Sequence, residues 1–220
     1  MKAIITGSTG MIGKGLLLEC LDDQRIEEVL VINRSPVKIQ HPKLREIIHP
    51  DFFDLSTLKN DLLEYDICYF CLGISAAGMK KEDYTRITYS LTLSFARSLL
   101  DINPEIVFCY ISGAGTDSSE QGRQMWARVK GRTENNLLKL PFKSVYMLRP
   151  GFIQPKKGIR SRTPLYNVIY VILWPFYPLL KGMKKYVTST DRLGRAMIRL
   201  GSEGWRNQIL EQIDLNELAS

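Results

Sequence analysis

The sequence has little of what several protein classes need. Its 220 residues include four cysteines and two histidines, and no internal repeat is visible. Four cysteines do not make a disulfide-stapled scaffold, and the absent repeat excludes solenoids and propellers. His41 and His49 each precede a proline and have no acidic or thiol neighbours, so no metal site is expected.

The cysteines also argue against redox chemistry. Cys68 and Cys71 have CxxC spacing but fall in an expected strand, where residues three apart point to opposite faces. The chain enters a strand at Lys2, directly after Met1, with no hydrophobic signal-peptide segment. We therefore expect reduced thiols and a cytoplasmic protein.

Long hydrophobic runs are missing too. The densest apolar stretch, Pro164–Leu180, is broken by Pro175 and Pro178. It is shorter than the roughly 20 residues that a membrane-spanning helix needs. The sequence therefore predicts no transmembrane helix.

Acidic residues are absent between Phe152 and Thr190, where seven basic residues fall. The formal net charge of +7 is thus a local feature, because the rest of the chain has 23 basic and 23 acidic residues. With no recognisable nucleic-acid-reading motif, no nucleic-acid partner is expected. Residues 156–185 combine basic flanks with aromatic residues, and three interpretations stay open: a lid over a site, a weak membrane or protein contact, or a packed helix with a solvated loop.

Strand and helix patterns alternate along the first 150 residues. This alternation predicts an α/β fold with a doubly wound parallel sheet. We expect one domain over residues 1–220, with residues 150–190 as a small C-terminal cap and Ile209–Leu218 packed back on the domain. The expected strands are Lys2–Thr6, Val29–Asn33, Leu44–Ile48, Asp66–Cys71, Glu105–Ile111 and Lys143–Leu148, and the expected helices are Met11–Leu21, Ser56–Leu63, Lys81–Leu100, Arg123–Leu140 and Asp191–Leu200.

A glycine-rich turn follows the first strand and opens the first helix, with GxxGxxG spacing. Gly7 permits a tight turn, Gly10 lets backbone N–H groups approach a diphosphate, and Gly13 lets the helix sit close to the strand. A helix N-terminus adds unpaired donors and a positive dipole end. The pattern predicts a nucleotide-binding loop formed by Gly7, Thr9, Gly10, Met11, Ile12 and Gly13.

The second strand ends at the segment Asn33-Arg34-Ser35, which begins 20 residues after Gly13. An acidic residue there would accept the ribose hydroxyls of NAD, and none is present. Arg34 can instead face a 2′-phosphate and stack on adenine. We expect NADP(H) to be preferred, with NAD(H) as the alternative if Arg34 is merely a solvated residue.

Two later strand ends complete the expected cofactor site. Asp54 follows the third strand and is expected at the adenine edge, although a loop or helix cap explains it equally well. Leu72 and Gly73 end the fourth strand, where a small residue lets the backbone pass over a dinucleotide.

Together with Thr6–Gly13, the motifs Phe70–Gly73, Tyr110–Gly113, Val129–Gly131 and Leu148–Gly151 carry a family resemblance over nearly the whole chain. The chain resembles the atypical short-chain dehydrogenases/reductases of the NAD(P)-dependent epimerase/dehydratase type. It is most similar to their Tat-interacting oxidoreductase-like branch. The resemblance implies a Rossmann fold with NADP(H) along the carboxyl ends of the strands, Pro150 included in its site, a small-molecule substrate and, by analogy, homodimer formation through the long helices.

The family resemblance also implies three catalytic positions. Ser112 fits the serine that orients a substrate carbonyl, and Lys130 fits the lysine that holds the nicotinamide ribose. The proton-transferring tyrosine would stand four residues before that lysine, on the same helix face. This chain has Trp126 there, and an indole N–H donates a hydrogen bond but does not ionise at useful pH.

Three explanations of Trp126 remain open. The chain can be an oxidoreductase or epimerase-like enzyme in which Tyr84, Tyr89 or Tyr110 has taken over proton transfer. It can instead be a catalytically silent NAD(P)-binding sensor or regulatory protein. Finally, Trp126 can be a packing residue that does not stand at the tyrosine position.

Overall fold

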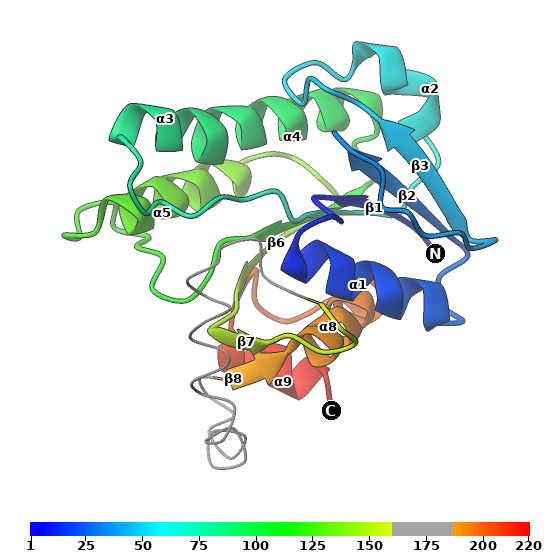
Figure 1. Ribbon diagram of the computed structural model, residues 1–220. Helices are drawn as coiled ribbons and strands as arrows, with labels where there is room; N and C mark the ends of the chain where they lie inside the picture. Colours follow the sequence, from blue (N-terminus) through cyan, green and yellow to red (C-terminus); the bar gives the residue numbers. More distant parts are fainter. Residues whose placement is uncertain (160–186) are drawn as a thin grey trace.

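The core of the protein is a parallel seven-stranded β-sheet with the strand order β3-β2-β1-β4-β5-β6-β9. A computed structural model describes residues 1–159 and 187–220 (Figure 1). The predicted α/β class with a Rossmann-type doubly wound sheet is confirmed. The strands are β1 (Lys2–Thr6), β2 (Glu28–Asn33), β3 (Leu44–Ile48), β4 (Ile67–Phe70), β5 (Val107–Ile111), β6 (Ser144–Arg149) and β9 (Ile209–Glu211).

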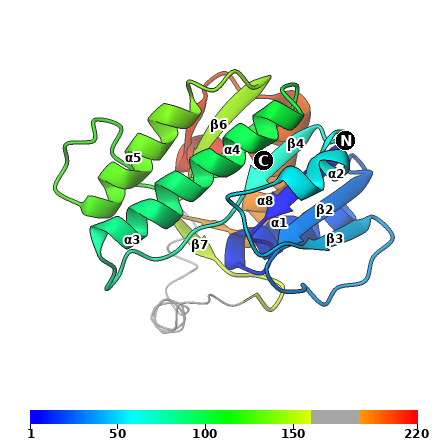
Figure 2. The same cartoon turned by 90° about the horizontal axis from the view of Figure 1, so that it is seen from above.

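Helices cover both faces of this sheet (Figure 1). One face carries α1 (Met11–Asp22), α8 (Thr190–Glu203) and α9 (Gln212–Leu218). The other carries α2 (Lys59–Leu62), α4 (Leu91–Ile102) and α5 (Met125–Leu137), with α3 (Lys81–Thr85) leading into α4. Figure 2 shows α4 and α5 running side by side above the sheet.

The β2 strand shows why the central sheet is so apolar. Val29 and Val31 belong to the core beneath α1, whereas Leu30 and Ile32 belong to the core beneath α4. All four side chains are fully buried. A strand with helices on both faces needs apolar residues at successive positions, which explains its continuous β-branched and aliphatic run.

Several element boundaries differ from the expectation. The predicted helix Lys81–Leu100 consists of α3, a π-helical turn over Arg86–Ser90, and α4. The predicted helix Ser56–Leu63 is a 3₁₀ turn followed by α2, and Ser56 provides no side-chain cap. Instead, the Ser56 backbone N–H donates to the carboxylate of Asp54.

Three short strands were missed in the C-terminal part. The tail contributes β9, which pairs with β6, and a separate parallel pair joins β7 (Phe152–Gln154) to β8 (Val187–Ser189). The aromatic stretch Pro164–Leu180 and most of the expected cap lie outside the described residues. Within the described ranges, no helix is both long and apolar enough to cross a bilayer.

Glycines bring α8 against α1. A Cβ atom at Gly15 would lie 2.8 Å from the Cβ of Thr190, and one at Gly194 would lie 2.7 Å from Cγ of Glu19. This close packing places the start of α8, and β8 before it, near the glycine-rich turn. The Lys157 side chain joins the same region through ion pairs with Glu19 and Asp22.

Candidate functional site

The glycine-rich turn has the backbone geometry that the sequence predicts. Gly7 has φ +67°, and a Cβ atom there would lie 2.7 Å from the carbonyl oxygen of Cys71. A Cβ atom at Gly13 would collide with the Gly7 carbonyl, while the Gly10 N–H donates to that carbonyl at 2.9 Å. Gly10 precedes α1 without any side-chain cap, so the helix begins with backbone groups alone.

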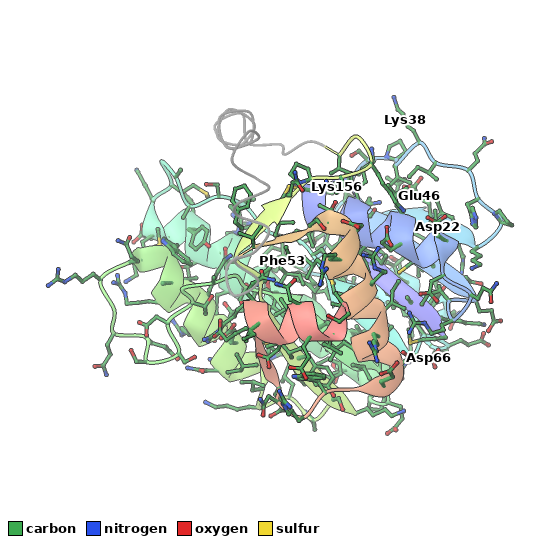
Figure 3. All side chains as sticks on the ribbon, turned by 90° about the horizontal axis from the view of Figure 1, so that it is seen from below. Asp22, Lys38, Glu46, Phe53, Asp66 and Lys156 are labelled. Atoms are coloured by element: carbon green, nitrogen blue, oxygen red, sulfur yellow. The ribbon has the colours of Figure 1, made fainter. Side chains whose placement is uncertain are left out.

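The end of β2 is held by buried polar contacts. Asn33 Nδ2 donates to Ser8 Oγ at 2.8 Å, so the Asn33 side chain braces the glycine turn. The Val37 N–H donates to Glu46 Oε1 at 2.9 Å. Figure 3 shows Lys38 projecting away from the molecule and Glu46 closer in. Arg34 and Ser35 are exposed on the loop between these anchors.

Glu46 is a residue that the sequence analysis missed. The sequence pattern places an acidic cofactor ligand at the end of β2, whereas Glu46 approaches the same loop from β3. The parallel pairing of β2 with β3 places Val31 opposite Glu46. The adjacent Arg45 and Glu46 within β3 did not by themselves indicate this role.

Three adjoining cavities follow the carboxyl ends of β1, β4 and β5, where the strand order reverses and α/β proteins bind ligands. We name them the glycine-turn cavity, of about 410 Å³, the Arg34 cavity, of about 440 Å³, and the Trp126 cavity, of about 910 Å³. Ile74 lines all three, so the cavities form a continuous row.

The Arg34 cavity combines a cation with aromatic walls. Arg34 and Asp51 stand at its lining with Phe52 and Phe53, and the Arg86 guanidinium lies 5.9 Å from the centre of the Phe53 ring. Asp54, expected at the adenine edge, does not line this cavity. Its carboxylate accepts hydrogen bonds from Ser56, which keep its pKa below the usual value.

The glycine-turn cavity gathers many of the predicted residues. Thr9, Asn33, Ser35 and Asp54 line none of the three cavities, and Gly7 and Gly13 shape the turn without lining it. The predicted residues in its lining are Gly10, Met11, Ile12, Leu72, Gly73, Ser112, Lys130 and Pro150.

Ser112 stands at the junction of the glycine-turn and Trp126 cavities, yet its side chain faces the protein interior. The residue is 1% exposed, and its hydroxyl donates to Glu134 Oε1 at 2.5 Å. Glu134 is fully buried and forms an ion pair with Arg149, whose Nε also donates to Glu134 Oε1 at 3.1 Å. The roles of Glu134 and Arg149 were not predicted from the sequence, although Glu134 lies one helical turn beyond Lys130 and Arg149 belongs to the Leu148–Gly151 motif.

Lys130 lines both the glycine-turn and Trp126 cavities. Its Nζ donates to the backbone carbonyl of Ser112 and lies 5.9 Å from the centre of the Trp126 ring. Burial lowers the pKa of this amine to about 8, because the protein interior solvates an ammonium less well than water does.

Trp126 forms a wall of the third cavity. A Cβ atom at Gly115, which has φ +83°, would lie 3.3 Å from Trp126 Cη2. Of the tyrosines considered as substitutes, Tyr84 lines this cavity. Tyr110 is buried in the core, and the Tyr89 ring packs 4.4 Å from the Arg132 guanidinium.

The cysteines of the chain are free thiols, and Cys71 lines the glycine-turn cavity while Cys68 is buried. Burial raises the pKa of Cys71 to about 12, which disfavours a thiolate there. Across residues 1–159 and 187–220, no three His, Cys, Asp or Glu side chains gather as metal ligands would.

Comparison with known proteins finds distant fungal relatives. No protein-family model matches the chain. The mitochondrial protein FMP52 of Meyerozyma guilliermondii is 26% identical over 156 residues, which are 70% of this chain and 65% of that protein. FMP52 of Saccharomyces cerevisiae is 27% identical over 74% of this chain and 69% of its own length, and that of Candida albicans is 22% identical over 97% and 93%.

Solved structures share the architecture over almost the whole chain. UDP-glucuronic acid 4-epimerase from Bacillus cereus in complex with NAD has a TM-score of 0.70 at 16% identity, covering 96% of this chain and 76% of the epimerase. The protein has the fold of NAD-binding sugar-nucleotide epimerases. MoeE5 in complex with UDP-glucose and NAD has a TM-score of 0.68 at 17% identity, covering 95% of this chain and 74% of MoeE5.

These comparisons correct one expectation. The cytoplasmic localisation predicted from the cysteines and the N-terminus is wrong by this measure, because the fungal relatives are named mitochondrial proteins. Reduced thiols do not distinguish the cytoplasm from another reducing compartment, so the cysteines do not identify the cytoplasm.

Proposed function

We propose that the protein is an NADP(H)-dependent oxidoreductase or epimerase-like enzyme that acts on a carbonyl or alcohol group of a small molecule. The observation that carries the proposal is the row of three cavities from Arg34, past the glycine turn, to Lys130 and Trp126. The row lies at the carboxyl ends of β1, β4 and β5, where the strand order of this sheet reverses and α/β proteins bind ligands.

The lining residues fit a nicotinamide dinucleotide. The uncapped start of α1 suits a diphosphate, since backbone N–H groups and the helix dipole favour anions there. The aromatic Arg34 cavity suits an adenosine, and Lys130 suits a ribose hydroxyl. When bound, the nicotinamide supplies or accepts a hydride, which is chemistry that no side chain offers.

The preference for NADP(H) over NAD(H) depends on Arg34. Its guanidinium offers several N–H donors in a planar fork that matches a phosphate. Asn33 replaces the acidic residue that would bind ribose hydroxyls, and its amide is engaged by Ser8 and Glu46. Glu46 brings a negative charge near the loop, and this charge repels a phosphate. The preference for NADP(H) therefore requires that the attraction between Arg34 and the 2′-phosphate exceed this repulsion.

Ser112 has a different part in this site from the one that the family resemblance implies. Its hydroxyl has Glu134 Oε1 and the Leu148 carbonyl as acceptors in the interior, and its backbone carbonyl accepts from Lys130, so the residue positions Lys130.

A second candidate function follows from Trp126. The indole cannot transfer a proton, which favours a catalytically silent NAD(P)-binding sensor or regulatory protein if no other group does so. Several expectations stay predictions: one domain over residues 1–220, the small cap, contacts through residues 156–185, a homodimer through the long helices, and membership of the Tat-interacting oxidoreductase-like branch.

The decisive experiment combines binding with turnover. We expect calorimetry to show NADPH binding, and we expect the native protein to oxidise NADPH when a panel of aldehydes, ketones and quinones is added. Binding without turnover across the panel, together with turnover by Trp126→Tyr, would favour the sensor. Absence of heat with both NADPH and NADH would contradict both functions.

A further inference from the structure

With Trp126 at the tyrosine position, the site needs another group to move a proton. We propose that Lys130 itself is the acid–base residue, giving a proton to the substrate oxygen in reduction and taking it back in oxidation. This inference rests on the proposed oxidoreductase function and goes beyond the ribose-holding role that the family resemblance implies for the lysine.

The position of Lys130 is the first argument. A proton donor for hydride transfer must reach the space where cofactor and substrate meet. Among the described residues, Lys130 is the one ionisable side chain that lines both the glycine-turn cavity and the Trp126 cavity. Tyr84 lines only the Trp126 cavity, and Cys71 lines only the glycine-turn cavity.

The way in which the amine is held is the second argument. The Ser112 carbonyl accepts one hydrogen bond from Nζ and fixes the end of a long side chain. An ammonium has three N–H groups, so this bond does not exhaust its donors. The Trp126 ring, whose centre lies 5.9 Å from Nζ, lines the same cavity as the amine.

The surrounding charges leave the amine able to lose its proton. Glu134 lies one turn further along α5, but Arg149 from β6 pairs with its carboxylate and Glu211 adds a second carboxylate to that arginine. The other titratable groups facing this region are Tyr84 from α3, whose pKa burial raises, and Cys71 after β4. Burial lowers the pKa of Lys130 to about 8, near the range where a general acid works best.

The proposed step balances without a further reagent. In the reduction, the π bond of the substrate carbonyl breaks and its electron pair goes to the oxygen. That oxygen takes a proton from Lys130 Nζ, while the carbon receives the hydride of the reduced nicotinamide dinucleotide. The neutral amine then regains a proton from water.

Three variants separate this role from ribose binding, with 9,10-phenanthrenequinone as the probe substrate. Lys130→Arg keeps the positive charge and the hydrogen-bond donors, but a guanidinium does not deprotonate in proteins. We expect it to bind NADPH within about threefold of the native affinity and to lose kcat by about 100-fold or more, as general acid catalysis is worth. Lys130→Met should lose both, and Tyr84→Phe tests the competing proton donor, with a smaller loss of kcat expected than in Lys130→Arg.

A second readout is independent of turnover. Lysines are dimethylated with ¹³C-formaldehyde and followed by NMR during a pH titration of the protein without cofactor. The Lys130 signal is assigned by its loss in Lys130→Arg. We expect this signal to titrate at least one unit below those of the surface lysines, and its titration together with them would overturn the inference.

The outcomes distinguish this inference from the proposed function. If Lys130→Arg retains kcat, or if Tyr84→Phe loses it while Lys130→Arg does not, Lys130 is not the acid–base residue but the oxidoreductase stands. If the native protein binds NADPH and never turns over, the oxidoreductase function fails and this role fails with it.

Discussion

Ser112 and Glu134 are joined by a 2.5 Å hydrogen bond between the serine hydroxyl and carboxylate Oε1, at a place that solvent hardly reaches. Arg149 neutralises the same carboxylate from β6. The bond ties the end of β5 to α5, and the Ser112 carbonyl in turn holds Lys130. The proposed catalytic amine is therefore positioned by a buried polar network rather than by the surface of the cavity.

Glu134→Gln tests how much stability this network provides. The change leaves the buried Arg149 guanidinium paired only with Glu211, which is half exposed. Removing one partner of a buried ion pair typically costs about 3 kcal/mol or more in the free energy of unfolding. Urea unfolding should show such a loss, whereas Glu217→Gln, which breaks an exposed pair with Arg206, should cost less than about 1 kcal/mol. Equal losses in the two variants would contradict the importance of the network.

Arg34→Ala tests the cofactor preference. A charge-assisted hydrogen bond is worth about 1.5–3 kcal/mol, so we expect the affinity for NADPH to fall by roughly 10- to 100-fold. The affinity for NADH should change by less than about threefold, because NADH has no 2′-phosphate. Calorimetry with both cofactors measures the two affinities, and Arg123→Ala, an exposed arginine outside the described cavities, is the matched control. An unchanged ratio of affinities would remove the argument for NADP(H).

Gly13→Ala tests the turn beneath the proposed diphosphate. The added methyl group would collide with the Gly7 carbonyl, so the helix must move away from the strand. Such overpacking costs about 1–3 kcal/mol, and the displaced turn should bind dinucleotides more weakly. Gly73→Ala is the control for stability alone, because a Cβ atom there meets nothing within 4 Å of the protein, although Gly73 lines the glycine-turn cavity. Thermal unfolding should separate the two variants, NADPH calorimetry compares Gly13→Ala with the native protein, and equal stability of the two variants would speak against the steric role of Gly13.

The lowered pKa of Lys130 predicts a pH dependence of stability. The amine titrates at about 8 in the folded protein and at 10.5 when unperturbed, so between these values the unfolded chain binds more protons. Stability from this group therefore rises with pH across that window and is lowest below pH 8. The unfolding free energy of the native protein, minus that of Lys130→Met, should increase by about 3 kcal/mol from pH 7.5 to pH 10.5. A constant difference would show that burial does not shift this amine.

The glycine turn and most of the central strands were predictable from the sequence. Gly7, Gly10 and Gly13 act within one loop, where steric limits on neighbouring residues decide the conformation. The buried strands show themselves through successive apolar residues, as in β2, because helices on both faces demand them. The boundaries of the long α3–α4 region were less predictable, since no proline or glycine between Lys81 and Leu100 marks the π-helical turn over Arg86–Ser90.

The partners of Ser112, the pairing of β9 and the approach of Glu46 emerged only when the chain was folded. β9 has three residues, and its pairing depends on β6, about 60 residues earlier. Ser112 and Glu134 come together across 22 residues, and Arg149 joins them from another strand. Steric limits and hydrophobic periodicity depend on residues that are close in the sequence, so the sequence by itself determines them. The direction of a buried hydroxyl depends instead on which distant charged side chains the packing of sheet and helices brings beside it.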